Sequence, residues 1–386
     1  MAQGFDETIN NIFANYTGWY VSFIFAPLPG TNFSWIALWL VVGALIFTGY
    51  FGFIQLKGFW HSIQLVKGDY SDPDDAGEVS HFQALATALS GTVGLGNIAG
   101  VAVAVSIGGP GATFWMVVAG LFGMATKFTE CTLGVKYRNE YPDGRGSGGP
   151  MYYITKGFGE RGLPGGKVLA VLFCIFTILG ALGGGNMFQA NQTFAQLRNV
   201  TGGETGLLGS GGAAFVFGLL LAALVGAVVF GGIKSVGAVT GRLVPAMAIV
   251  YVTACLLVIA VNIAQVPTAV GLILSGAFSA EGVVGGALGA MIVGFQRAAF
   301  SNEAGIGSAA IAHSAVRTKE PVTEGYVALL EPFIDTVVIC TMTALVIVIS
   351  GVLNVDPETG LYIWNAEAGR ISTEGEVVGV ALTSAA

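Results

Sequence analysis

The chain has 386 residues, a length that would give two or three domains in a soluble protein. Its composition excludes a soluble protein, because 54% of the residues are hydrophobic and only 10% are charged, whereas soluble domains carry about 25% charged residues. A net charge of −7 without any Lys/Arg block argues against a nucleic-acid partner, so the composition predicts an all-α polytopic membrane protein.

Residues 1–33 form the first unit along the chain. They are too polar to span a bilayer, and their interleaved aromatic side chains suit the membrane–water interface. The stretch has neither a basic start nor a small-residue cleavage site, so we do not expect a removable signal peptide.

Apolar runs long enough to cross a bilayer as helices follow, each of about 18 residues or more. The eight predicted spans are Trp35–Phe53, Phe82–Ile107, Gly111–Val135, Val168–Leu197, Leu207–Phe230, Leu243–Ile263, Val283–His313 and Tyr326–Gly351. All four cysteines fall inside these runs without a CxxC pair, so we expect reduced packing residues and no transition-metal site.

The loops between these spans divide by charge. Twelve of the 16 basic residues fall in alternate loops on one side, and the opposite loops hold only Arg198 and Arg370. Because cytoplasmic loops collect Lys and Arg, the N-terminus is predicted to lie outside the cell.

Two of the predicted spans contain polar, Gly-rich interruptions. Residues 90–100 read SGTVGLGNIAG, and residues 300–308 read FSNEAGIGS. Clustered Gly with Asn and Ser favours turns over helix, and non-helical backbone at membrane depth survives only where protein or a watery cavity satisfies it. We therefore predict a break in both helices, the alternative being close helix packing through small residues.

The spacing of the two breaks predicts the architecture. If the first interrupted span begins a set of five, the second interrupted span begins the next set, and an odd number of crossings makes the second set run the opposite way. Paired discontinuous helices in inverted repeats indicate the binding site of a secondary transporter. The predicted units are residues 78–265 as a first five-helix repeat and 281–386 as an incomplete second repeat, with roughly three further spans expected beyond this chain.

A broken helix exposes two kinds of backbone ligand. Free N–H groups at the start of a half-helix attract a carboxylate, and free carbonyls at the end of a half-helix attract Na⁺ or an ammonium group. We expect the amides from Gly94 to Gly96 to hold a substrate carboxylate. The carbonyls near Thr92 and Val93, with the side-chain oxygen of Asn97, are expected to suit Na⁺, a hard cation that prefers oxygen.

The second break and two later positions add side-chain candidates. Ser301 supplies a hydroxyl for the cation, and Phe300 is expected to close over the substrate. Asp335 is interpreted either as a cation ligand or as a hydrogen-bonding partner of a neighbouring helix. Gln189 is interpreted either as part of the pocket or as a polar contact between helices.

Four other charged residues are predicted at membrane depth. Arg297 and Glu303 flank the second break, and they are interpreted either as a mutual ion pair or as contacts with the substrate or coupling ion. Lys127 and Glu130 lie near the inner end of their span, where snorkelling or a salt bridge explains them. No catalytic constellation is found, and none of the three histidines is expected at depth as a base, so neither an enzyme nor a cofactor is predicted.

At these motifs the chain resembles the sodium:alanine/glycine symporter family, also called amino acid carrier proteins. The matching stretches are GLGNIAG at 94–100, GGPGA at 108–112, FWM at 114–116, GMATK at 123–127, GGPMY at 148–152, GGIKS at 231–235 and residues 300–308. The resemblance extends from about residue 78 to the end of the eighth span.

The resemblance implies a leucine-transporter-like 5+5 inverted-repeat fold, preceded by one extra helix at residues 34–54 and here lacking its last helices. It implies a pocket formed by Thr92, the backbone from Gly94 to Gly96, Gln189 and Phe300. Family members often carry a threonine where this chain has Leu95, which puts a side-chain hydrogen bond to the substrate in doubt. The next helix of the family, absent from this sequence, is expected to supply further substrate and sodium contacts.

The activity that the resemblance implies is Na⁺-coupled, less often H⁺-coupled, uptake of alanine or glycine across the cell inner membrane. The expected partners are Na⁺, a small neutral amino acid and the lipid bilayer, without an obligate protein partner. A symporter for another small solute, and a channel or substrate sensor on the same scaffold, are the alternatives.

Overall fold

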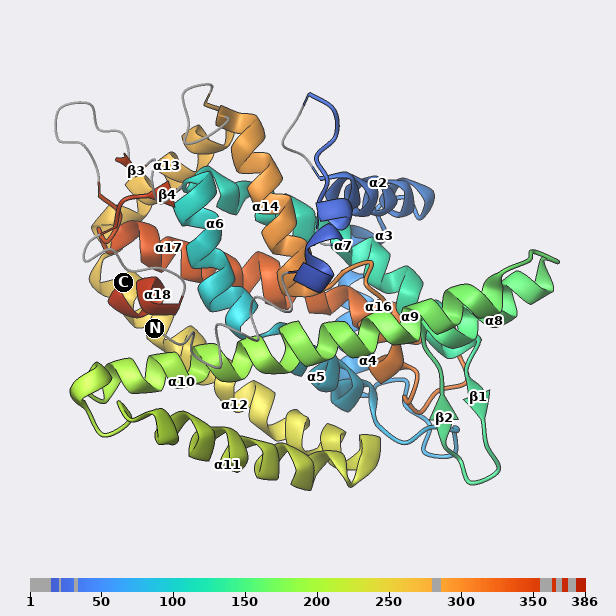
Figure 1. Ribbon diagram of the computed structural model, residues 1–386. Helices are drawn as coiled ribbons and strands as arrows, with labels where there is room; N and C mark the ends of the chain where they lie inside the picture. Colours follow the sequence, from blue (N-terminus) through green and yellow to red (C-terminus); the bar gives the residue numbers. More distant parts are fainter. Residues whose placement is uncertain are drawn as a thin grey trace.

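The computed structural model describes residues 15–20, 22–30, 34–279, 286–354, 363–365, 370–373 and 380–386. Its regular structure is almost entirely helical (Figure 1). Two short antiparallel ladders complete it. Strand β1 (Asn139–Glu140) pairs with β2 (Gly146–Ser147), and β3 (Trp364–Asn365) pairs with β4 (Arg370–Ile371).

The helical segments follow one another along the chain with short connections. They are α2 (Trp35–Tyr50), α3 (Ile54–Lys57), α4 (Phe59–Lys67), α5 (His81–Thr92), η1 (Gly96–Gly100), α6 (Val101–Gly108), α7 (Gly111–Lys136), α8 (Pro150–Glu160), α9 (Gly166–Gly180), η2 (Ala181–Met187), α10 (Phe188–Val200), η3 (Gly203–Thr205), α11 (Gly211–Val229), α12 (Gly232–Val261), η4 (Ile263–Gln265), α13 (Val266–Phe278), α14 (Gly286–Asn302), α15 (Ser308–His313), α16 (Pro321–Pro332), η5 (Phe333–Cys340), α17 (Thr341–Ile349) and α18 (Val380–Ala385). Segments η1, η2 and η5 are π-helical, whereas η3 and η4 are 3₁₀ turns.

Several of these helices have the length and apolar composition of membrane spans. Within the described residues five helices qualify by length and composition, or up to six when the bent pair α5 and η1–α6 counts as one span. This is the pattern expected of a polytopic membrane protein. Helix α2 is apolar but has only 16 residues, so the predicted first span is shorter than expected. The predicted start of the seventh span at Val283 lies outside the described residues.

Both predicted breaks are confirmed. The chain bends by 53° between His81–Thr92 and Gly96–Gly108. The second helix ends at Asn302 and resumes at Ser308, and Glu303, Gly305 and Gly307 have positive φ between them. A positive φ is costly for a residue with a Cβ atom, which explains why two of the three are glycines.

The two broken helices pack side by side in opposite directions. A Cβ atom added to Gly96 would lie 3.1 Å from Ser301 Cα, and one added to Gly108 would lie 3.0 Å from Val293 Cβ. Residue numbers therefore rise along one helix as they fall along the other. This confirms the antiparallel relation that the spacing of the two breaks predicts.

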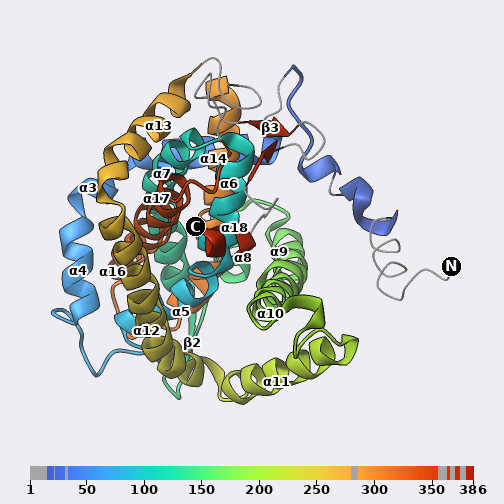
Figure 2. The ribbon, with the colours of Figure 1, turned by 90° about the vertical axis from the view of Figure 1, so that its left-hand side faces the viewer.

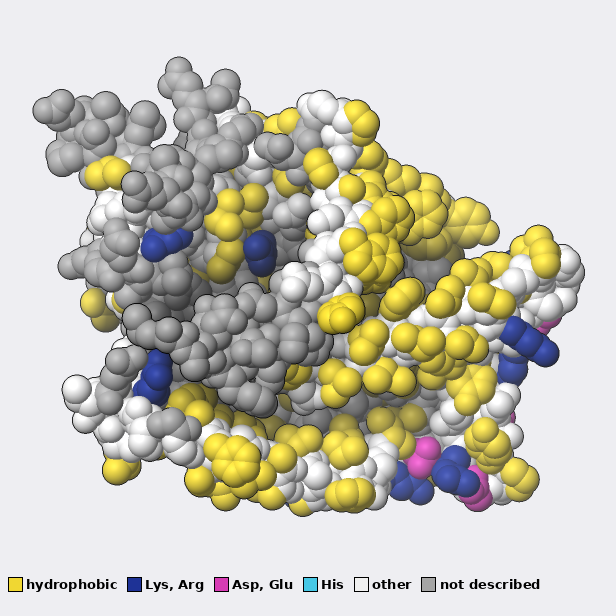
Figure 3. All heavy atoms as spheres, viewed as in Figure 1, with side chains coloured by type: hydrophobic (Ala, Val, Ile, Leu, Met, Phe, Trp, Pro, Cys, Tyr) yellow, Lys and Arg dark blue, Asp and Glu magenta, His cyan; other side chains and the backbone are white. Residues whose placement is uncertain are grey.

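Helix α7 lies in the interior of the molecule and contacts α2, α13, α14, α15 and α16 (Figures 1 and 2). Helices α9, α10 and α11 curve along one side of this core, and their outward residues are mostly exposed apolar side chains (Figures 2 and 3). Exposed Leu and Val in such numbers are typical of a surface that faces lipid.

Two elements differ from the sequence-based prediction. Helix α12 begins at Gly232 rather than Leu243, because its first turns pack on α5, where the Thr87 and Thr240 hydroxyl oxygens lie 3.1 Å apart. Helix α13 was not predicted. It buries Ala269, Ile273 and Ala277 on one face. These residues are spaced four apart, which is a helical pattern that the sequence already contains.

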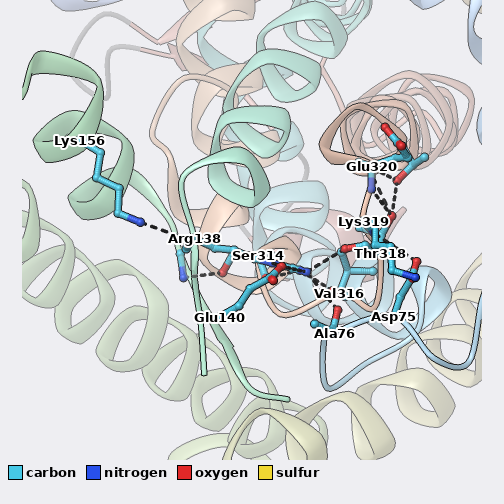
Figure 4. A network of polar contacts seen from close by, with 12 residues as sticks. Asp75, Ala76, Arg138, Glu140, Lys156, Ser314, Val316, Thr318, Lys319 and Glu320 are labelled. Atoms are coloured by element: carbon cyan, nitrogen blue, oxygen red, sulfur yellow. Dashed lines mark hydrogen bonds and ion pairs between the residues drawn. The ribbon is translucent and has the colours of Figure 1, made fainter. Parts of the chain in front are cut away.

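Arg138, just after α7, ties together the loops at the end of the molecule that carries β1, β2 and α8 (Figure 4). Its guanidinium Nη2 lies 2.8 Å from Glu140 Oε1, which forms an ion pair. It donates hydrogen bonds of 2.6–3.1 Å to the backbone carbonyls of Ala76, Ser314, Val316 and Thr318. The loop after α15 is thereby held against the loop before α5.

Candidate substrate and cation site

The first break is stabilised by its own asparagine. Helix α5 ends at Thr92, Val93 is extended, and the Gly94 N–H donates a 2.7 Å hydrogen bond to Asn97 Oδ1. Asn97 thus accepts from the N–H three residues before it, as the N3 side chain of a capping box does at a helix start. The π-helical turn η1 begins one residue before Asn97, so the break combines a cap with a widened turn.

The amide nitrogen of Asn97 points away from this turn toward η5 and α14. Its Nδ2 donates to Asp335 Oδ1 at 2.7 Å and to the Asp335 carbonyl at 3.0 Å. Ser301 Oγ lies 3.3 Å from the same nitrogen. Asn97 and Asp335 are more than 200 residues apart in the sequence. Their side chains and that of Ser301 therefore meet in one buried cluster only in the folded chain.

Asp335 is the centre of this cluster and is fully buried. Ser301 Oγ donates to its Oδ2 at 2.8 Å, and Thr336 Oγ1 donates to the same oxygen at 2.7 Å. No basic side chain among the described residues forms an ion pair with it. A buried carboxylate held only by neutral donors is expensive at membrane depth, and a bound cation would remove that cost.

π-Helical backbone recurs around this cluster. Segment η1 follows the first break, η5 carries Asp335, and η2 ends directly before Phe188 and Gln189. Such turns are rare, and they are frequent at functional sites because they move side chains out of the regular helical register.

The residues predicted for the substrate lie along the first break and beside the cluster. A Cβ atom added to Gly94 would lie 3.7 Å from Gln189 Oε1, so the Gln189 side chain faces the unwound backbone. Phe300 is half-exposed and packs edge-on against Phe188, with ring centroids 6.1 Å apart. Leu95 is buried.

The other two predicted residues of this stretch, Thr92 and Val93, are also buried. Among the described residues, the Thr92 hydroxyl has no hydrogen-bond partner. The Val93 side chain packs in an apolar cluster with Leu330 and Ile339. Only its backbone is therefore a candidate for ligand contact.

The predicted ion pair between Arg297 and Glu303 is wrong. Glu303 follows the end of α14 and accepts a hydrogen bond from Ser308 Oγ. Among the described residues Arg297 Nε is buried without a partner. Because Glu303 lies beyond the end of α14 and has a positive φ, its side chain does not follow the helical spacing from Arg297.

Lys127 does not snorkel. It is fully buried, with Nζ 2.9 Å from Glu331 Oε1 and 3.7 Å from Glu130 Oε1. The salt-bridge interpretation with Glu130 is confirmed, and Glu331 is a second, closer partner that sequence reasoning missed.

Two histidines are buried in the protein interior. His81 Nδ1 and His313 Nδ1 lie 2.5 Å and 2.6 Å from the two carboxylate oxygens of Glu324, and all three side chains are buried. His81 begins α5 and His313 ends α15, so both lie at helix ends as predicted, but the sequence did not predict their burial. Neither histidine contacts Asn97, Ser301 or Asp335 in the described structure, so this group is separate from the cation cluster.

Comparison with known proteins assigns the family. The model of the sodium:alanine symporter family matches residues 20–383 of this chain. The chain belongs to this family. Members of the sodium:alanine symporter family are transporters, so the protein is a transporter and not an enzyme.

Three relatives illustrate the similarity. The sodium/alanine symporter AgcS of Methanococcus maripaludis is 42% identical over 326 residues, which cover 83% of this chain and 69% of AgcS. The amino-acid carrier protein AlsT of Bacillus subtilis is 38% identical over 326 residues, 83% of this chain and 66% of AlsT. The putative sodium/proton-dependent alanine carrier protein YrbD of Bacillus subtilis is 36% identical over 345 residues, 89% of this chain and 67% of YrbD.

The structure adds further residues to this site that the sequence analysis did not predict. Asn302 Nδ2 donates to Thr336 Oγ1 at 2.9 Å, and Cys340 Sγ lies 3.3 Å from Asn97 Nδ2. Thr383 Oγ1, on α18, donates to the Ile98 carbonyl at 3.1 Å. Thr336 and Cys340 lie one and five residues after Asp335, a signal that a search around the intramembrane carboxylate would have found. Nothing in the sequence places Thr383 at the first break.

Proposed function

We propose that this chain carries out Na⁺-coupled symport of alanine or glycine into the cell by alternating access. The observation that supports it best is the meeting of Asn97, Ser301 and Asp335, which joins both broken helices to a buried carboxylate. A monovalent cation there would tie the two helices together. A membrane potential supplies about 2.3 kcal/mol per charge per 100 mV, enough for roughly fifty-fold accumulation per coupled Na⁺.

The proposed fold is a leucine-transporter-like 5+5 inverted repeat with α2 as an extra first helix. Two interrupted helices that pack antiparallel through Gly96 and Ser301 support it. The proposed repeats cover residues 78–265 and 281–386, and α13 lies between them as a connecting helix. The proposed location is the plasma (inner) membrane, with the N-terminus outside because basic residues crowd the opposite loops.

The proposed sodium ligands are the Val93 carbonyl, Asn97, Ser301 and Asp335. In the described structure Asn97 Oδ1 accepts a hydrogen bond from the Gly94 N–H. Asn97 Nδ2 and Ser301 Oγ both donate to the Asp335 carboxylate. A Na⁺ ion would replace their donated hydrogen bonds as the partner of that carboxylate. Asn97 and Ser301 would then offer oxygen rather than hydrogen, which both side chains can do by rotation.

The proposed substrate site lies on the other side of the same unwound backbone. The amides of Gly94, Leu95 and Gly96 would hold the carboxylate, and the Gln189 amide faces Gly94 from η2–α10. Thr92, whose hydroxyl is unpartnered in the described structure, would supply a hydrogen bond, and Phe300 would cover the side chain. The buried Leu95 makes this part of the pocket apolar, which favours alanine or glycine over a polar amino acid.

The test is uptake of labelled alanine by proteoliposomes with and without an inward Na⁺ gradient. Replacing Ser301 by Ala removes one contact to the Asp335 carboxylate and should weaken Na⁺ activation of uptake by about tenfold. Ser350→Ala is a matched control, because the Ser350 hydroxyl donates only to the carbonyl of Ile347 in its own helix. Uptake that ignores Na⁺ would refute the coupling.

Two further measurements separate the alternatives. A carrier exchanges labelled for unlabelled alanine in counterflow, whereas a channel or sensor does not. A proton gradient applied without Na⁺ tests H⁺ coupling, which is part of the name of the relative YrbD.

A further inference from the structure

A chain of buried ionisable side chains runs between the helices at a distance from the proposed sodium ligands. Glu324 on α16 accepts from His81 on α5 and His313 on α15, at 2.5 Å and 2.6 Å. Glu331, two turns further along α16, lies 2.9 Å from Lys127 on α7. Glu130 completes the chain, 3.7 Å from Lys127.

The charges in this chain do not balance when both imidazoles are neutral. Lys127 supplies one positive charge, while Glu130, Glu324 and Glu331 supply three negative ones. All of these side chains are buried, and a buried charge without a partner is strongly unfavourable. Protons bound to the imidazoles or to the carboxylates would make this buried chain neutral.

The geometry around His313 locates one such proton. Its Nδ1 is committed to Glu324, so a neutral ring that donates there would turn a bare Nε2 toward Glu331. Nε2 lies 3.9 Å from Glu331 Oε2, and both atoms are buried without a hydrogen-bond partner in the described structure. A lone pair that faces a carboxylate at this distance is repelled by it, whereas a charged N–H in the same place is attracted to it.

We propose that His313 binds a proton in the protein interior, as an imidazolium between Glu324 and Glu331, and that this proton fastens the half-helices α5 and α15 to α16. The ligand of this second site is H⁺, and none of its residues belongs to the proposed substrate or sodium site. Only the transport measurement below rests on the proposed symport.

The position of the site explains why a proton there acts on a gate. His81 belongs to the first half of one broken helix, His313 to the second half of the other, and Glu324 holds both. Ala88 and Ala309 pack in one cluster, so the two half-helices also touch directly. Loss of the His313 proton sets a bare nitrogen against Glu331 and adds a net negative charge, which favours their separation.

Other ionisable groups face this site from each neighbouring element. Helix α5 contributes His81, α7 contributes Lys127, Glu130 and Cys131, and α16 contributes Glu324 and Glu331. Helix α8 contributes Tyr153, whose hydroxyl approaches Gly307 at the start of α15. Lys127 is the only cation among them and already lies between two carboxylates, so it does not replace the proton on His313.

The direct test is ¹⁵N-histidine NMR of the purified full chain in lipid nanodiscs at pH 8. The sequence has only three histidines, and spectra of His61→Gln and His313→Gln assign them. His61, which packs against Tyr70 and Tyr326, serves as the reference. We expect two protonated ring nitrogens at His313. A bare Nε2 on His313 at pH 8 would overturn the proposal, whether or not the chain transports alanine.

The transport measurement asks whether this proton acts on the gate. Alanine uptake at saturating Na⁺ is compared between pH 6 and 9 for wild type, His61→Gln and His313→Gln. Gln preserves a donor toward Glu324 but binds no proton. We expect uptake by wild type and His61→Gln to change with pH, by up to tenfold per pH unit for one linked proton, and uptake by His313→Gln to lose that dependence. An unchanged pH profile in His313→Gln would refute the gating role. If that variant does not fold, the wild-type spectrum still decides the proton site.

Discussion

Ser301 Oγ lies 2.8 Å from Asp335 Oδ2, and this single contact joins the helix that ends at the second break to the π-helical turn η5. The same serine packs against Gly96 of the first break. The two interruptions and the buried carboxylate thus form one unit. A change in any of them is expected to alter the other two.

Replacing Asp335 by Asn keeps the shape of the side chain but removes its charge. Hydrogen bonds and contacts to a charged group contribute about 1.5–3 kcal/mol, so the apparent Na⁺ affinity of uptake should fall by about 10- to 100-fold. The measurement is a Na⁺ titration of alanine uptake. Asp69→Asn, an exposed position after α4, is the matched control and should leave the titration unchanged. Equal Na⁺ affinity in Asp335→Asn and wild type would exclude Asp335 as a ligand.

Gly96→Ala tests the close approach of the two broken helices. The added methyl group would lie 3.1 Å from Ser301 Cα, tighter than ordinary packing, so we expect a destabilisation of about 1–3 kcal/mol and a loss of uptake. Gly91→Ala adds the same group where no atom lies within 4 Å. It should be neutral, or stabilising by about 0.4–1 kcal/mol. Thermal unfolding in detergent and uptake in proteoliposomes measure the two effects, and similar results for both variants would contradict the packing.

Lys127→Met removes the lysine of the buried ionic chain while preserving most of the volume of that side chain. Glu331 and Glu130 would then lose their ion pairs with Lys127, and breaking a buried ion pair costs about 3–5 kcal/mol in comparable cases. We expect a lower apparent melting temperature, partly restored in the double variant Lys127→Met/Glu331→Gln. Lys67→Met is the control at an exposed lysine and should change stability by less than about 0.5 kcal/mol. A double variant no more stable than Lys127→Met alone would argue against an unpaired Glu331 as the cause.

The turn between β1 and β2 should show a pH effect outside the membrane. The pKa of Asp143 is lowered by the backbone N–H of Arg145 and by its guanidinium group, whose Nε lies 2.6 Å from Asp143 Oδ2. A lowered pKa means that this carboxylate stabilises the turn above its ordinary pKa, and that the stabilisation is lost as pH falls through the lowered value. In a ¹³C-carboxyl NMR titration, Arg145→Ala should move the Asp143 pKa back up toward the ordinary value of an aspartate. An unchanged pKa of Asp143 in that variant would show that the Arg145 side chain does not lower it.

Much of the site could be predicted because its residue types are unusual where they occur. Clustered Gly, Asn and Ser inside apolar runs predict both breaks correctly, and Asp335 is the carboxylate nearest the middle of a later apolar run. The partners of the charged residues could not be predicted. Lys127 and Glu331 are 204 residues apart, and their contact depends on how α7 and α16 are rotated against each other. Arg297 and Glu303 are near in sequence, yet the end of α14 between them sends their side chains to different places.

The sequence by itself determined the class of protein, the number of long apolar helices to within a few, and the two points where helices break, because each depends on local composition and on the cost of polar backbone in lipid. Only the tertiary structure decided that Asn97, Ser301 and Asp335 meet, and that Glu324 gathers His81 and His313 from two different helices. Contacts of this kind arise from the register and rotation of helices that are distant in the chain. No local pattern in a single sequence encodes either quantity.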